Sequence, residues 1–170
     1  TVDDICKACE ITKGTFYHNY ESKDHVVSTS LNNKLDEYLE QNFVLDAGQR
    51  SADQLSGLLQ CSMDFFKSTG KIMIRKATES LARSNVDVDG SLKERVFLKY
   101  LDGVVDRILQ EKQLCTDFTS LELKLSAQAL LCGVMVYYSI QEDCMDQAVD
   151  WNRIIDNQVQ CLFVSAAPSL

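Results

Sequence analysis

The sequence is nearly free of proline: its 170 residues include a single one, Pro168, close to the C-terminal end. Proline interrupts helices because it lacks a backbone N–H and its ring clashes with the preceding helical turn. The sequence also lacks the alternation of apolar and polar residues that half-buried strands show, and it has no internal repeat. We therefore predict an all-α fold.

The cysteines do not follow the pattern of a disulfide scaffold. There are seven of them, an odd number, scattered without regular spacing. No signal peptide is visible, and the longest apolar run, from Ala127 to Ile140, is too short to cross a bilayer as a helix. We expect a soluble cytoplasmic protein with reduced thiols and no membrane contact.

Motifs of catalysis and cofactor binding are missing from the sequence. No nucleophile elbow accompanies a Ser/His/Asp set, no glycine-rich loop is placed to hold phosphate, and no carboxylates have the spacing of metal ligands. The sequence therefore predicts neither an enzyme nor a metal or cofactor site. What remains is a protein that acts by binding.

Positive charge is scarce as well. Lysine and arginine number 17 against 25 aspartates and glutamates, which gives a net charge of −8. This balance is unfavourable for nucleic-acid binding, since phosphate contacts need lysine or arginine. Net charge governs long-range steering rather than the chemistry of a site, so it weakens a DNA-binding function without excluding it.

Signals for helix ends, in contrast, are frequent. Thr1, Ser51, Ser91 and Thr119 are each followed three residues later by a side chain suited to complete a capping box. Between these starts and the loop glycines, apolar residues recur every three or four positions. The predicted helices cover residues 2–9, 12–20, 22–45, 52–68, 72–81, 92–113, 120–142 and 147–164, of which the last six form the body of the chain.

The most specific pattern lies in the first 25 residues. A short helix over residues 2–9 is predicted to turn Ile5, Ala8 and Cys9 inward, and a tight turn follows it. Thr12 is placed to cap a second short helix, in which Phe16 and Tyr20 lie four residues apart on the buried side.

The outer face of this second helix carries side chains that suit the DNA major groove. The helix is narrow enough to enter the groove, and its glycine lets the backbone approach closely. A lysine in the first turn of the next helix is placed to contact a phosphate. The candidate DNA-binding residues are Thr12, Lys13, Gly14, Thr15, Tyr17, His18 and Lys23.

Three segments of this region resemble the DNA-binding domain of the tetracycline-repressor (TetR) family: Thr1-Val-Asp-Asp-Ile, Ile11-Thr-Lys-Gly-Thr-Phe-Tyr and Ser22-Lys-Asp. The resemblance implies that residues 1–25 belong to a helix-turn-helix DNA-binding module, and residues 26–170 to a helical ligand-binding and dimerisation domain. It further implies a homodimeric repressor that binds a palindromic double-stranded DNA operator and is released by a small-molecule inducer.

The chain departs from the family pattern in three places. The family's module has one more helix at its start, so we expect a further segment upstream of Thr1. Glu10 occupies a turn position where the family usually has glycine, and a left-handed backbone there costs a non-glycine residue roughly 1 kcal/mol. Cys6 and Cys9 stand where the family usually has alanine.

The spacing of Cys6 and Cys9 also leaves open a redox or metal sensor. The two histidines, His18 and His25, do not follow at the spacing of a classical zinc finger. Two cysteines three residues apart lie on one face of a helix, where they also fit as small packing residues. Packing is the interpretation that we favour.

Two further sets of candidates lie in the body. Aromatic and polarisable side chains on the middle helices are candidates for a pocket that holds a mostly apolar inducer. They are Cys61, Phe65, Met73, Phe97, Tyr100 and Tyr137. The last two helices are apolar enough to pack on the chain with one face and on a second copy with another, unless both are simply core helices. The candidate dimer residues are Leu130, Val134, Tyr138, Trp151, Ile155, Val159 and Leu162.

Two functions therefore remain. The first is a ligand-responsive transcriptional repressor, favoured by the helix over residues 12–20. The second is a dimeric helical protein that binds a small molecule or a protein partner and has weak or lost DNA binding. It is favoured by Glu10 and the acidic start of the chain.

Overall fold

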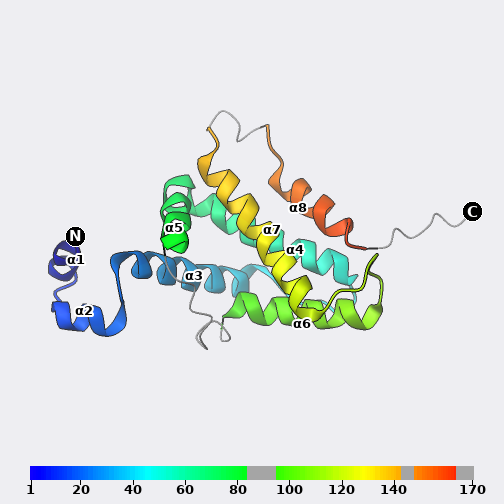
Figure 1. The fold of residues 1–170 in the computed structure, drawn as a ribbon, viewed down its shortest axis with the longest axis horizontal. Helices are drawn as coiled ribbons and strands as arrows, with labels where there is room; N and C mark the ends of the chain where they lie inside the picture. The colour runs from blue at the N-terminus through cyan, green and yellow to red at the C-terminus, as the bar shows by residue number, and fades with distance from the viewer. Residues whose placement is uncertain (84–94, 143–147, 164–170) are drawn as a thin grey trace, which may run out of the picture.

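The computed structural model describes residues 1–83, 95–142 and 148–163. These residues form helices joined by loops and contain no β-strand, which confirms the predicted all-α fold for the described part of the chain (Figure 1). Each predicted helix has a counterpart whose ends differ from the prediction by a few residues. The helices are α1 (Val2–Ala8), α2 (Lys13–Asn19), α3 (Lys23–Asn42), α4 (Ser51–Thr69), α5 (Lys71–Arg83), α6 (Val96–Glu111), α7 (Ser120–Ile140) and α8 (Trp151–Gln160).

The predicted capping boxes are confirmed at two helix starts and wrong at a third. Thr1 caps α1 and Thr119 caps α7, each with the reciprocal bond from the side chain three residues later. Ser51, however, is the first residue of α4 rather than its cap, and its hydroxyl donates to the carboxylate of Glu111 on α6. The Ser51 hydroxyl thus bonds to a side chain 60 residues away and does not form the cap that the local pattern predicts. The predicted box at Ser91 lies outside the described residues.

Helix α4 is the centre of the body. It contacts α3, α5, α6, α7 and α8, and in Figure 1 it lies behind α7. Its Leu55, Leu58, Leu59 and Met63 have no exposed surface, as expected for a helix that is covered from several sides. The helix ends at Gly70, whose φ of 88° is a backbone conformation that glycine adopts without strain.

Helix α7 has one buried and one exposed apolar face. By length and composition alone it is long enough and apolar enough to cross a membrane. In this structure one face packs on α4, α5, α6 and α8, as the face of a core helix does. The other face is exposed. The buried residues are Leu123, Ala127, Leu131, Val134, Met135, Tyr138 and Ser139.

Helix α3 connects the N-terminal helices to the body. Figure 1 shows α1 and α2 projecting beyond the N-terminal end of α3, away from α4, α6 and α8. Further along, Leu31, Leu35 and Leu39 of α3 are buried against the body. The predicted boundary at residue 25 falls within the first turns of α3, so one continuous helix runs from the N-terminal region into the core.

Candidate nucleic-acid interface

The turn between α1 and α2 has the geometry of a Schellman motif. The N–H of Ile11 donates to the carbonyl of Cys6 at 3.0 Å, and the N–H of Glu10 donates to that of Lys7 at 3.4 Å. Glu10 has a φ of 54°, the left-handed conformation expected from its place in the turn. Glycine adopts this conformation freely, whereas glutamate is destabilised by roughly 1 kcal/mol.

The two helices pack through a small set of side chains. Phe16 is only 1% exposed, and its ring centroid lies 5.8 Å from that of Tyr20 and 5.2 Å from that of Tyr17. Neighbouring residues of the described chain therefore cover Phe16 almost completely. The inward residue of α1 is Cys6, at 6% exposure, whereas Ala8 and Cys9, predicted to face inward, are exposed.

The start of α2 is fixed by Thr12, as predicted. Its hydroxyl oxygen accepts from the N–H of Thr15 at 3.1 Å and lies 2.9 Å from the Thr15 hydroxyl. Thr12 and Thr15 are therefore hydrogen-bonded to each other, and both residues remain exposed to solvent. A capping side chain that orders a helix end stabilises the helix by about 1 kcal/mol.

The remaining candidates on α2 lie on its exposed side. Lys13, Gly14 and His18 are exposed, and Tyr17 is 57% exposed with its ring edge-to-face against Phe16. The structure thus brings the candidates of α2 together on a short helix that projects from the body. This face offers an ammonium group, hydroxyl groups, an imidazole and an aromatic ring, a set that suits contacts to phosphates and base edges.

Lys23 lies on the neighbouring helix. It is exposed at the first position of α3, where Ser22 caps the helix by accepting from the N–H of His25 at 3.0 Å. His25 in turn accepts from the N–H of Glu21 at 3.2 Å through Nδ1, and its ring packs on Tyr20. The loop between α2 and α3 is therefore held by local bonds, which keep Lys23 close to α2.

One contact of this face is absent from the predicted set. Nζ of Lys13 lies 2.8 Å from a carboxylate oxygen of Asp3 on α1. This ion pair spans ten positions across a turn, so it does not follow the three- or four-residue spacing that identifies pairs within one helix. The carboxylate raises the pKa of Lys13 through a hydrogen bond and through its charge.

A substitution at Gly14 tests whether the backbone of α2 approaches DNA closely there. A Cβ added there lies 3.6 Å from the Thr12 hydroxyl oxygen, an ordinary contact, so the fold accepts alanine. We expect Gly14→Ala to leave thermal stability unchanged or raise it, by up to about 1 kcal/mol, because alanine favours helix. We also expect it to weaken DNA binding several-fold, measured by fluorescence anisotropy. Undiminished DNA affinity in this variant shows that Gly14 is not needed for close approach.

The residues predicted to bind an inducer do not line a common cavity among the described residues. Phe65 and Phe97 are buried in the core, and Phe65 packs on the ring of Tyr38. Cys61 and Tyr100 are partly buried and pack against the same core. Met73 and Tyr137 lie at the surface, with 43% and 66% of their area exposed. Helical periodicity placed these residues on middle helices but did not reveal which side of each helix is covered.

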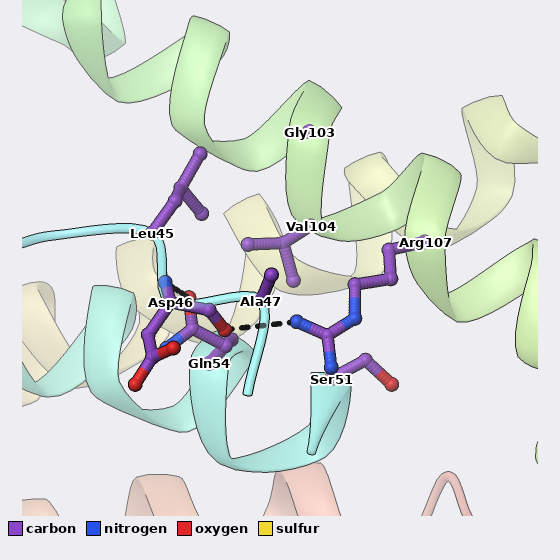
Figure 2. Close-up of a pocket in the computed structure, with 8 residues that line it drawn as sticks. All are labelled: Leu45, Asp46, Ala47, Ser51, Gln54, Gly103, Val104 and Arg107. Atoms are coloured by element: carbon purple, nitrogen blue, oxygen red, sulfur yellow. Dashed lines mark hydrogen bonds between the residues drawn. The ribbon is translucent and has the colours of Figure 1, made fainter. Parts of the chain in front are cut away.

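A small pocket does lie between the α3–α4 loop and α6 (Figure 2). It has a volume of about 170 Å³ and is lined by Leu45, Asp46, Ala47, Ser51, Gln54, Gly103, Val104 and Arg107. The guanidinium of Arg107 donates to Glu111 and to the carbonyls of Asp46 and Gln49, while Gln54 accepts from the N–H of Asp46. These polar groups are hydrogen-bonded to one another. The bonds from Arg107 hold the α3–α4 loop against α6.

Most residues predicted for the dimer interface belong instead to the core of the chain. Val134, Tyr138, Trp151, Ile155 and Val159 are each at most 9% exposed. Leu130 and Leu162 are partly buried against the same core. The apolar stripe of α8 and one side of α7 therefore pack against the core of the same chain. Apolar periodicity leaves open this alternative, in which both are core helices. A partner surface on α7 has to consist of its exposed residues.

The six cysteines that the structure describes are free and show no arrangement suited to a metal ion. Cys6 is buried and Cys9 is exposed, and no group of three or more His, Cys, Asp or Glu side chains suited to hold a metal occurs in residues 1–83, 95–142 and 148–163. Burial raises the pKa of the Cys61 thiol, which lowers its reactive thiolate fraction. The described residues thus give no support to a sensor that uses Cys6 and Cys9.

No family model, curated protein or solved structure matches this chain. Its function is therefore inferred from its own residues and their geometry.

Proposed function

We propose that the chain is a DNA-binding transcriptional regulator of the tetracycline-repressor type, acting as a homodimeric cytoplasmic repressor. In this proposal α1, the turn and α2 are part of a helix-turn-helix module, and α3 to α8 form a six-helix ligand-binding and dimerisation body. The observation that carries the proposal is the face of α2. It projects from the body, begins at a satisfied threonine cap and presents Lys13, Tyr17 and His18 to solvent.

A recognition helix of seven residues needs support from a rigid base, and the packing here supplies one. Phe16 is buried between the rings of Tyr17 and Tyr20, and Tyr20 packs on His25 of α3. The orientation of α2 is thereby tied to α3, which continues into the core. Groups held in this way lose little conformational freedom on binding, which favours specific contacts to base edges.

A second copy of the chain is the proposed partner of the exposed face of α7. This face, which we call the α7 exposed stripe, carries one charged residue, Glu122, which lies at its N-terminal end and is bonded to Thr119. The rest of the stripe is uncharged and consists of Leu121, Leu125, Ala129, Cys132, Gly133, Val136, Tyr137 and Ile140. A Cβ added at Gly133 would meet no atom within 4 Å, so its centre is open to close approach. Two antiparallel copies would place the leucine end of one stripe against the Val136–Ile140 end of the other, which satisfies a two-fold axis.

The dimer predicts a clear effect of a charge in this stripe. Val136 is 40% exposed, so Val136→Asp leaves the core of the single chain intact but places a carboxylate in the apolar contact. We expect the molar mass from sedimentation or light scattering to fall from that of a dimer to that of a monomer. Val44→Asp, at a loop residue that is 77% exposed, is the matched control. A mass that does not change with Val136→Asp contradicts the assignment of α7.

We propose that a small, mostly apolar inducer binds in the body and releases the operator. This part of the proposal is supported by the sequence resemblance. A palindromic operator follows from the two-fold axis, because each copy contributes one α2 to one half-site.

The second candidate function is a helical dimer with weak or lost DNA binding. Two observations favour it: Glu10 is exposed beside α2, and Asp3 holds the ammonium group of Lys13. A gel-shift assay separates the candidates, with the full-length protein and DNA from upstream of its own gene. The repressor predicts a sequence-specific shift that weakens as salt rises. The absence of any such shift favours the second candidate.

A further inference from the structure

The contact between Lys13 and Asp3 joins two exposed side chains from different helices. Their side chains are 61% and 57% exposed, and the Nζ–Oδ1 distance is 2.8 Å. Ion pairs this exposed contribute at most about 1 kcal/mol to stability, so folding depends little on this one. Its position matters more, because Lys13 is the sole lysine or arginine among the seven residues of α2.

We infer that Asp3 competes with DNA phosphate for Lys13 and thereby limits the affinity of this face for DNA. The inference rests on the proposed DNA-binding function and concerns how strongly that function operates. When Lys13 contacts a phosphate, it exchanges the carboxylate of Asp3 for the phosphate oxygen. The loss of the Asp3 contact offsets part of the free energy that the phosphate contact contributes.

The neighbouring charges support this assignment. Lys7 is exposed on α1 and Lys23 on α3, and neither has a carboxylate at ion-pair distance among the described residues. Asp4, next to Asp3, is held in the capping box by the Thr1 hydroxyl. Asp3 is thus the carboxylate of α1 that forms an ion pair with the cation of α2.

The test compares Asp3→Asn with the wild-type full-length protein by fluorescence anisotropy, using the duplex that the gel shift identifies. We expect about three- to tenfold tighter binding at low salt. We also expect the dependence of log K on log salt to steepen by up to about one unit, since Lys13 no longer exchanges one anion for another. Asp106→Asn on α6 removes the same charge far from α2 and is the control for net charge.

A double-mutant cycle with Lys13→Ala shows whether Asp3 changes the affinity for DNA through Lys13. In the Lys13→Ala background we expect Asp3→Asn to change the affinity less than twofold. An equal gain in both backgrounds shows general repulsion and overturns the inference, as does unchanged or weaker binding of Asp3→Asn. The circular-dichroism spectrum and melting temperature of each variant show whether weaker binding reflects lost helix, with Asp3→Ala as a second variant. If wild type and Asp3→Asn both fail to bind any duplex, the proposed function itself fails.

Discussion

Replacing Lys13 and Tyr17 together with alanine is expected to lower the affinity for operator DNA about a hundredfold or more. Both side chains are exposed on α2, and Phe16, which loses its contact with Tyr17 in this variant, keeps its contact with Tyr20. A side-chain contact to DNA contributes about 1–3 kcal/mol, and each 1.4 kcal/mol corresponds to a factor of ten. Two lost contacts therefore remove most specific binding.

The melting temperature of this double variant should stay close to that of wild type, because the two side chains lie outside the core. Lys99→Ala on α6 removes one exposed lysine in the body and serves as the control for lost charge. Dissociation constants at fixed salt for wild type, control and double variant complete the comparison. A double variant that still binds within threefold of wild type would contradict the role of α2.

Replacing Leu59 with alanine is expected to destabilise the body by about 2–5 kcal/mol. Leu59 has no exposed surface and lies on α4, which contacts five other helices. The substitution removes three carbon atoms from a packed interior and leaves a cavity, which accounts for a cost of this size. Urea unfolding monitored by circular dichroism measures it as a lower midpoint at an unchanged slope.

The matched control is Val44→Ala, since that side chain is 77% exposed and already contacts water. We expect it to change the free energy of unfolding by less than about 0.5 kcal/mol. A cost below 1 kcal/mol for Leu59→Ala would show that α4 is not the packed centre of the body.

The parts of the structure that sequence predicts well are those with local causes. The caps at Thr1, Thr12 and Thr119 each depend on a partner three residues away, and all three are present. The resemblance to the TetR family predicts the left-handed backbone at Glu10, where the family usually has glycine. Ser51 has the same local pattern but bonds to Glu111, which the chain brings close only after folding.

The parts that sequence leaves undetermined depend on which face of a helix is covered. Periodicity identifies α7 and α8 as apolar, but Val134 and Trp151 lie in the core while Val136 and Tyr137 lie at the surface. The same ambiguity explains why the predicted inducer residues do not share a cavity. The pair of Asp3 and Lys13 joins two helices across a turn, so no spacing rule identifies it.

The affinity of the full-length protein for duplex DNA tests the central claim most directly. A duplex selected from random sequences by the protein is compared with a scrambled duplex of equal length and composition, by fluorescence anisotropy at several salt concentrations. The proposed function predicts binding to the selected duplex at least a thousandfold tighter, about 4 kcal/mol, and weaker binding as salt rises. Equal affinity for both duplexes, or no binding to either, would contradict it.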